Sequence, residues 1–335
     1  MRYIIYGAGA VGGTIGGRLA LAGHDVILIC RGAHYDAVRA NGLLLQTPEP
    51  EGETLISIAA VNHPRDITFA PGDCVILTTK TQHTEGALSD LEAAAGTDIP
   101  VVCAQNGVEN ERLAARRFRT VYGMLVNLPA THLVPGEVIA AGTPLSGVLH
   151  AGRYPDGVDA TVEQLCADIS ASHFVADADP AIMRIKYAKL LQNLSNAADV
   201  AIGRPAAESP EGVAILRETR QEAARVLAAA GIEVSPPDEV AARVQRHYSA
   251  AAVGGKARSA SSTLQSVMRG HTTIEVDYLN GEIILLGRLY GVPTPLNAVL
   301  RRVATAIAAK GEGGNPIPVA ELAALIEQER QASDG

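Results

Sequence analysis

Short apolar runs alternate with helical stretches over the first half of the chain. The runs predict strands at 2–6, 25–30, 43–46, 73–78, 100–104 and 119–125. The stretches between them predict helices at 11–22, 34–40, 83–95 and 108–116. This alternation is typical of a doubly wound parallel sheet. Two glycine-punctuated segments, 137–141 and 146–150, are expected to be strands that extend the sheet in antiparallel fashion.

The hydrophobic period becomes helical in the second half. It predicts helices at 158–171, 180–200, 209–230, 236–250, 275–291, 296–310 and 318–331. The predicted fold class is therefore α/β, with an N-terminal Rossmann-type doubly wound sheet and an all-α C-terminal domain. We place the boundary near Asp177–Pro180, which gives a nucleotide-binding domain at 1–178 and a helical substrate domain at 179–335.

Composition narrows the classes of function. The chain has 335 residues and 19% charged residues, and no apolar run approaches the roughly 20 residues of a membrane span. A net charge of −8 disfavours nucleic acid as a main partner. The four cysteines show no C-x-x-C pairing and fit a cytoplasmic protein with reduced thiols. The nine histidines form no metal-binding pattern, so no metal is expected, while a homodimer and a monomer remain open.

A glycine fingerprint follows the first predicted strand. It reads Gly7-Ala8-Gly9-Ala10-Val11-Gly12 and leads into an apolar helix and a second strand, as a dinucleotide site requires. Gly7 permits a tight turn, Gly9 lets the backbone approach a pyrophosphate, and Gly12 lets the helix pack closely on the strand. The helix N-terminus would then face the anion with free N–H groups. The alternative is a glycine-rich turn that binds nothing.

The end of the second predicted strand indicates which dinucleotide binds. A site for NAD usually carries a carboxylate there, whereas this chain has Arg31. A guanidinium can bind a 2′-phosphate with two hydrogen bonds, so NADP(H) is favoured over NAD(H). Arg31 could instead be a solvated residue at the start of a loop.

Two further groups of residues are candidates for binding and catalysis. Asn106 and Lys80 each follow a predicted strand, at the edge of the sheet where α/β folds bind ligands. A plain Asn-Gly turn and a solvated lysine are the alternatives. Lys189, Asn193 and Asn196 would share one face of an otherwise apolar helix, where polar groups need partners such as a bound substrate. A solvated helix face is equally consistent with that spacing.

The whole chain resembles the ketopantoate reductase (2-dehydropantoate 2-reductase) family, because a series of its segments matches the family in order and spacing. The matching segments are the glycine fingerprint, Arg31, Leu77–Lys80, Gln105–Val108, Lys189-x-x-x-Asn193, Ser261–Gln265 and Glu275–Gly281. The resemblance implies NADPH-dependent reduction of the ketone of a 2-oxo acid to a 2-hydroxy acid.

The resemblance also implies a role for each matching residue. Lys189 would be the general acid, and Glu275 would hold the lysine or the substrate hydroxyl. Asn193 and Ser262 would bind substrate, and Asn106 would bind between nicotinamide and substrate. The cofactor set would be Gly7, Ala8, Gly9, Ala10, Val11, Gly12, Arg31, Lys80 and Asn106. Asp277 and Asn280 are interpreted as structural.

Two departures from the family pattern affect the substrate side. The family has a second asparagine eight residues after the lysine, where this chain has Ala197, and Asn196 is the neighbour that could replace it. The spacing from Ser262 to Glu275 is also one residue longer than usual. The expected reaction is ketopantoate to pantoate, which belongs to pantothenate and coenzyme A synthesis. A reductase of another 2-oxo acid, an imine reductase and a non-catalytic NADP(H)-binding sensor are the alternatives.

Overall fold

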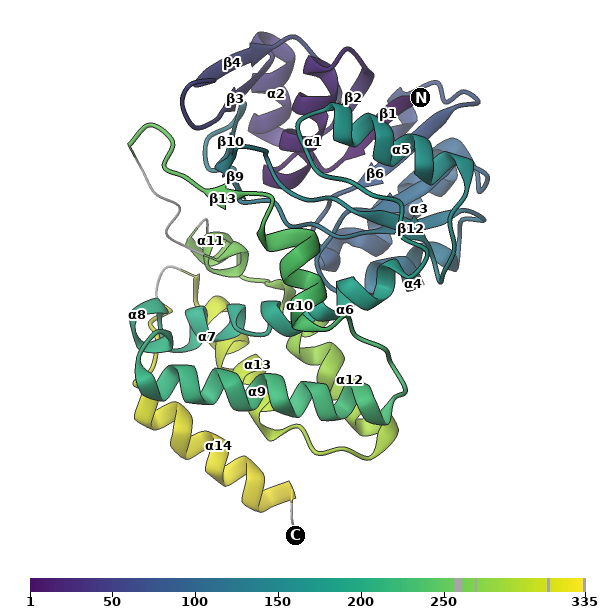
Figure 1. The fold of residues 1–335 in the computed structure, drawn as a ribbon. Coiled ribbons are helices and arrows are strands. Elements are labelled where there is room, and N and C mark those ends of the chain that lie inside the picture. Colours follow the sequence, from purple (N-terminus) through teal and green to yellow (C-terminus); the bar gives the residue numbers. More distant parts are fainter. Residues whose placement is uncertain (256–260, 269, 312–313, 334–335) are drawn as a thin grey trace. The chain divides into compact units, whose positions relative to one another are not determined.

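The computed structural model describes residues 1–255, 261–268, 270–311 and 314–333 (Figure 1). Its contacts divide the chain into two compact units. The sheet-bearing unit comprises Met1–Lys186 and Pro236–Arg258, and the helical unit comprises Tyr187–Ser235 and Ser259–Gly335. The boundary predicted at 178 stays a prediction.

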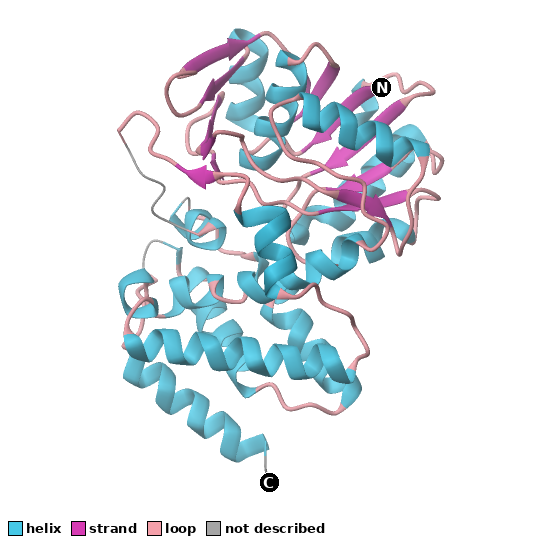
Figure 2. Ribbon diagram, viewed as in Figure 1, coloured by secondary structure: helices cyan, strands magenta, loops and turns pink. Residues whose placement is uncertain are grey.

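A seven-stranded sheet forms the centre of the sheet-bearing unit (Figure 2). Its strands, in spatial order, are β12 (Ala151–Arg153), β8 (Val121–Met124), β7 (Val101–Cys103), β6 (Asp73–Leu77), β1 (Arg2–Tyr6), β2 (Asp25–Ile29) and β5 (Ala59–Val61). All neighbours are parallel except β12 and β8. The strand order reverses at β1, as in doubly wound dinucleotide-binding folds. The predicted α/β class with a Rossmann-type sheet is confirmed.

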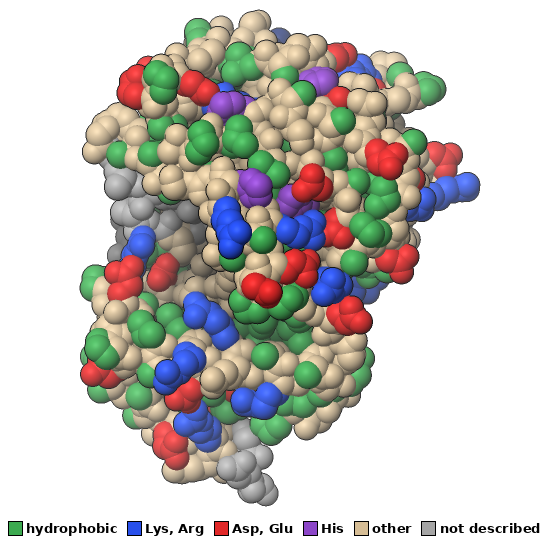
Figure 3. All heavy atoms as spheres, in the orientation of Figure 1, with side chains coloured by type: hydrophobic (Ala, Val, Ile, Leu, Met, Phe, Trp, Pro, Cys, Tyr) green, Lys and Arg blue, Asp and Glu red, His purple; other side chains and the backbone are tan. Residues whose placement is uncertain are grey.

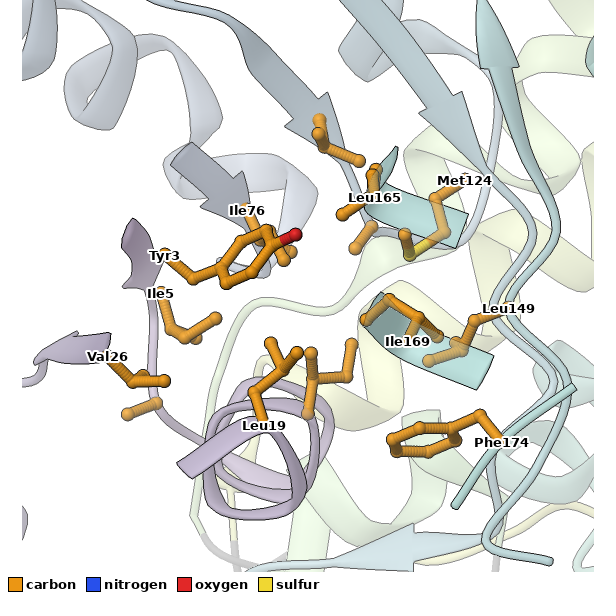
Figure 4. Close-up of a cluster of buried hydrophobic side chains, with 14 of the residues drawn as sticks. Tyr3, Ile5, Leu19, Val26, Ile76, Met124, Leu149, Leu165, Ile169 and Phe174 are labelled. Carbon is orange, nitrogen blue, oxygen red and sulfur yellow. The ribbon is translucent and has the colours of Figure 1, made fainter. Parts of the chain in front are cut away.

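The unit also contains helices, several of which bury apolar side chains in the two hydrophobic cores that contain the strands of the sheet. These helices are α1 (Ala10–Leu21), α2 (Gly32–Asn41), α3 (Thr84–Ala95), α4 (Glu109–Ala115), α5 (Ala160–Ala171), the first part of α6 (Ile182–Asn193) and α10 (Pro237–Val240). Figure 4 shows Tyr3 and Ile5 of β1 pointing toward Leu19 of α1 and Ile169 of α5. The Tyr3 hydroxyl donates to Asp168 Oδ2 at 2.6 Å, so this deeply buried phenol keeps a polar partner.

A second sheet changes two strand assignments. Its order is β4 (Glu53–Ile56), β3 (Leu43–Gln46), β10 (Glu137–Ala140) and β9 (Ala130–Thr131). The segments 43–46 and 137–141 are therefore strands, but they pair with each other in parallel, with Leu44 opposite Glu137. The antiparallel extension of the main sheet is β12 instead, and 146–150 contributes only two isolated bridges, from Val148 to Asn127 and to Val175. Local patterning indicates a strand but does not specify its partner.

The helical unit is built around α13 (Pro295–Ala308). The other helices are the second part of α6, α7 (Asn196–Ala201), α8 (Arg204–Ala207), α9 (Pro210–Ala229), α11 (Ser262–Met268), α12 (Asn280–Tyr290) and α14 (Val319–Ser333). Val299, Leu300 and Ala304 of α13 are fully buried in the core of this unit. Two predicted helices are interrupted: 180–200 divides into α6 and α7, and 275–291 begins with the 3₁₀ helix Glu275–Tyr278.

The segment 236–250 was wrongly predicted as one helix. It contains α10, a π-helical turn at Ala241–Gln245 and the strand β13 (Ser249–Ala250), which pairs with β11 (Gly142–Thr143). The Arg243 carbonyl lies 3.1 Å from His150 Nε2, which is a tertiary contact at the widened turn. Tertiary hydrogen bonds and strand pairing therefore override the helical pattern here.

Acidic and basic side chains are interspersed on the face drawn in Figure 3. The protein also has ion pairs near its surface, such as Arg302 with Glu329 at 2.7 Å. Among the residues that the structure describes, no helix has the length and apolar character needed to cross a membrane.

Candidate active site

The glycine fingerprint forms the turn between β1 and α1. Gly7 has φ +108°, in the region that favours glycine. The Gly7 and Ala8 N–H groups donate to the Ile29 carbonyl at 3.0 and 3.2 Å, and the Gly9 N–H donates to the Gly7 carbonyl at 2.7 Å. Ala10 is the first residue of α1 and Val11 the second. The turn is therefore held to the end of β2 by its own backbone.

The three glycines of the motif have different surroundings. A Cβ at Gly7 would lie 2.8 Å from the Thr79 nitrogen, and one at Gly12 would lie 2.5 Å from the Gly7 carbonyl oxygen. A Cβ at Gly9 would meet no atom within 4 Å. Gly7 and Gly12 thus allow close packing within the protein, whereas Gly9 faces open space. This arrangement fits a pyrophosphate that approaches the backbone at Gly9.

Arg31 lies two residues after the end of β2 and directly precedes α2. Its Nη2 lies 3.4 Å from both the Tyr6 hydroxyl and Asp90 Oδ2, and its side chain is 65% exposed. His63 Nε2 also lies 3.4 Å from Asp90 Oδ2. Burial raises the pKa of Tyr6, which remains a neutral hydrogen-bonding group. The exposed Arg31 guanidinium can therefore bind a phosphate, but the Asp90 carboxylate competes with the phosphate for it.

Lys80 and Asn106 lie at one edge of the main sheet. Lys80 follows β6, Asn106 follows β7, and these strands are parallel neighbours. The Gln105 side chain joins the two segments, since its Nε2 donates to the Thr79 carbonyl at 2.7 Å. The Asn106 carbonyl accepts from Asn110 Nδ2 at 3.2 Å. The structure thus brings two predicted site residues together at the carboxyl edge, where such folds bind ligands.

A buried ion pair lies beneath this edge and was not predicted. Lys186 Nζ lies 2.8 Å from Glu111 Oε1 and donates to the carbonyls of Gln105 and Met124 at 2.9 and 3.0 Å. Burial raises the pKa of the Glu111 carboxyl, and the Lys186 ammonium opposes that rise. A lysine three residues before Lys189 in an apolar helix is the only sequence signal for this pair.

In the helical unit, α6 and α7 carry the expected polar residues. Lys189 and Asn193 are one helical turn apart on α6, and Asn193 is buried. Because α6 ends at Asn193 and α7 begins at Asn196, the uninterrupted helix assumed for the face of Asn196 is not present. Asn196 is half-buried, and the neighbouring Ala197 is buried.

The remaining predicted residues lie in α11, in the 3₁₀ helix Glu275–Tyr278 and at the start of α12. Glu275 is buried and begins a 3₁₀ helix. Ser262 is the first residue of α11, but its side chain lies outside the described residues. Asp277 accepts from Arg301 Nε at 2.6 Å, and Asn280 Nδ2 donates to Asn297 Oδ1 at 3.0 Å. Both hydrogen bonds lie within the helical unit, and the structural interpretation of Asp277 and Asn280 stays a prediction.

Within the described ranges, no three His, Cys, Asp or Glu side chains gather in a way that could hold a metal ion. All four cysteines are buried free thiols.

Both halves of the chain match known family profiles. Residues 3–156 match "Ketopantoate reductase PanE/ApbA", and residues 181–308 match "Ketopantoate reductase PanE/ApbA C terminal".

Curated proteins and solved structures agree with that match. The 2-dehydropantoate 2-reductase of Pyrococcus horikoshii is 29% identical over 326 residues, which cover 93% of this chain and 99% of that protein. The chain is also similar to a crystal structure of a PanE/ApbA family ketopantoate reductase from Ralstonia eutropha JMP134, with a TM-score of 0.76 and 28% identity over 93% of this chain and 100% of that one. A ternary structure of D-mandelate dehydrogenase with NADH and anilino(oxo)acetate shares the fold, with a TM-score of 0.77 and 24% identity over 92% of this chain and 99% of that one.

Proposed function

The chain belongs to the ketopantoate reductase PanE/ApbA family and is an oxidoreductase that uses a nicotinamide dinucleotide, and we propose that it reduces ketopantoate to pantoate with NADPH. The observation that carries the proposal is the match of both halves, together with a lysine, an amide and a carboxylate at the family's positions in one compact unit. That lysine is Lys189, and the other two residues are Asn193 and Glu275. A protein that only sensed the dinucleotide would not need these three residues together.

The reaction needs a hydride donor, a proton donor and groups that orient the ketone. NADPH supplies the hydride when it is bound. The Lys189 ammonium then donates a proton to the carbonyl oxygen as negative charge develops there, and Glu275 holds that ammonium in its charged form. Asn193, Asn196 and Ser262 bind the substrate. Placing a proton donor in this way typically contributes about 10²–10⁴-fold in rate.

The sheet-bearing unit supplies the cofactor contacts in this proposal. The turn Gly7–Gly12 binds the pyrophosphate, and Arg31 and Lys80 bind the phosphate or ribose of the adenosine half. Asn106 contacts the nicotinamide and the substrate. The open space at Gly9 supports the first of these assignments.

A reductase of a different 2-oxo acid is the second candidate. It is favoured by Ala197, which is 1% exposed and stands where the family has an asparagine. A buried methyl group cannot replace the hydrogen bonds of an amide, so the substrate that binds here can differ in its polar groups.

We also infer a cytoplasmic setting and no nucleic-acid partner. Four buried free thiols are compatible with a reducing compartment, and the net charge of −8 opposes polyanion binding.

The test is NADPH oxidation by the purified protein with ketopantoate and a panel of other 2-oxo acids. The Lys189→Ala variant is the control, and we expect its turnover to fall by about 10² or more with NADPH affinity unchanged. Preference for another acid would move the proposal to the second candidate. Tight NADPH binding without turnover of any acid would favour a sensor, and loss of NADPH affinity in the variant would refute the role of Lys189.

A further inference from the structure

The Lys186 ammonium is surrounded by three oxygen atoms within 3.0 Å. It donates to the Gln105 and Met124 carbonyls at 2.9 and 3.0 Å, and it forms an ion pair with Glu111 Oε1 at 2.8 Å. The side chains of Lys186 and Glu111 are 2% and 0% exposed. All four residues belong to the sheet-bearing unit.

Stability alone does not explain a pair in this position. Removing two charges from water is costly, and well-packed hydrophobic residues often replace a buried ion pair without loss. The chain even makes room for the pair, because a Cβ at Gly123 would lie 3.3 Å from Glu111 Oε1. Two of the three contacts of Lys186 are moreover to backbone carbonyls at the carboxyl ends of β7 and β8, and not to side chains.

The contact with Gln105 acts directly on the next residue. The carbonyl of Gln105 and the N–H of Asn106 belong to one planar peptide unit, so a donor that fixes the carbonyl also fixes the orientation of that N–H. On the other side of Asn106, its carbonyl accepts from Asn110 Nδ2 at 3.2 Å. The backbone of Asn106 is thus held before and after the residue.

We propose that Lys186 is a positioning residue that fixes the peptide before Asn106, with Glu111 as its buried counter-ion. The inference rests on the proposed function, in which Asn106 contacts nicotinamide and substrate. Misplacing a group at the reacting centre by about 1 Å can cost roughly 10²-fold in rate. Lys186 therefore acts on turnover through Asn106, without touching the reacting atoms.

The test compares two double variants with a matched control. Lys186→Met/Glu111→Gln and Lys186→Met/Glu111→Met remove both charges, so neither leaves an uncompensated ion in the interior. The control is Asp73→Asn, which breaks the pair that Asp73 makes with Arg2 at 2.6 Å where β6 and β1 begin. That pair lies at the opposite edge of the same sheet from Asn106.

We expect the double variants to lose about 10- to 100-fold in kcat, while NADPH affinity changes less than about threefold. Asp73→Asn should lower the thermal midpoint without lowering kcat. Hydrogen–deuterium exchange of the backbone amides from Gln105 to Val108 should be at least about tenfold faster in the double variants, and unchanged in the control.

The exchange measurement separates this inference from the proposed function. If the wild-type protein reduces no 2-oxo acid, the proposed function fails, and faster exchange still supports fixation of the peptide by Lys186. Wild-type kcat and exchange in a folded double variant would overturn the inference. Failure of both double variants to fold, measured by circular dichroism, would also overturn it, because the pair would then serve the fold as a whole.

Discussion

Replacing Arg31 by alanine should weaken the binding of NADPH much more than that of NADH. The Arg31 guanidinium follows β2, where folds of this type bind the ribose of the adenosine half. NADPH differs from NADH by one phosphate on that ribose. The substitution therefore removes a contact to the 2′-phosphate, which NADPH carries and NADH lacks.

The size of the effect follows from the contacts that Arg31 makes. A charge-assisted hydrogen bond contributes about 1.5–3 kcal/mol. Against this, binding must disrupt the pair with Asp90, whose 3.4 Å separation and 65% and 39% exposed side chains place it among surface pairs worth about 0–1 kcal/mol. The net gain is about 1–2 kcal/mol, which corresponds to roughly 5- to 30-fold in affinity.

The assay is a titration of dihydronicotinamide fluorescence with each cofactor, since the chain has no tryptophan to complicate the signal. Arg31→Ala should raise the Kd for NADPH about tenfold and change that for NADH by less than about threefold. Asp90→Asn, which removes the competing carboxylate, should lower the Kd for NADPH by a few-fold. Equal weakening of both cofactors by Arg31→Ala would refute the assignment of Arg31 to the 2′-phosphate.

Two further predictions concern stability. His34 is buried, with Nδ1 accepting from the Gly136 N–H at 2.9 Å and Nε2 2.7 Å from the Ala8 carbonyl, and burial followed by the nearby His132 lowers its pKa below 6.5. The unfolded chain binds a proton at His34 more readily than the folded chain. The stability that neutral His34 contributes is therefore present above about pH 6.5 and is lost as pH falls through the lowered pKa. Each tenfold difference in proton affinity between the folded and unfolded chain corresponds to about 1.4 kcal/mol. In urea unfolding between pH 7 and pH 5, His34→Gln should lose less free energy of unfolding than wild type, and parallel curves would contradict this account. Glu222 is fully buried and accepts from the Leu296 and Asn297 N–H groups at 3.1 and 3.0 Å, so Glu222→Ala leaves the first turn of α13 unsatisfied and should cost about 3 kcal/mol or more. Glu222→Gln, which keeps a carbonyl acceptor and the side-chain volume, should cost less in the same urea assay; equal losses would show that the charged carboxylate, and not a retained acceptor, accounts for the effect.

The sequence predicted best what is local. The glycine turn could be identified because its requirements lie within six consecutive residues and the two flanking strands. Arg31 was found for the same reason, since it lies two residues after the end of β2. The pairing of β3 with β10 could not be predicted, because the partners are about 90 residues apart and each pattern fits more than one neighbour.

The buried polar residues were the least predictable part of the site. Lys186 and Glu111 are 75 residues apart, and a charged residue in a helix is normally read as exposed. The sequence pointed to Lys189 and Asn193 by their spacing, and that spacing survives in α6. The predicted face does not extend to Asn196, because it assumed a continuous helix and the helix is interrupted between Asn193 and Asn196.

The residues on the two sides of β1 have different expected roles, one in the choice of dinucleotide and the other in the rate of reaction. From β1 the chain leads to β2 and β5 on one side and to β6, β7 and β8 on the other, so the glycine turn lies at the point where such folds bind a dinucleotide. Arg31 lies on the β2 side, whereas Lys80, Asn106 and the Lys186–Glu111 pair lie on the other. Substitutions on the β2 side should therefore change which dinucleotide binds, and substitutions beneath β7 and β8 should change how fast the bound dinucleotide reacts. If Arg31→Ala altered kcat with either cofactor as strongly as the Lys186 double variants do, this division of roles would be wrong.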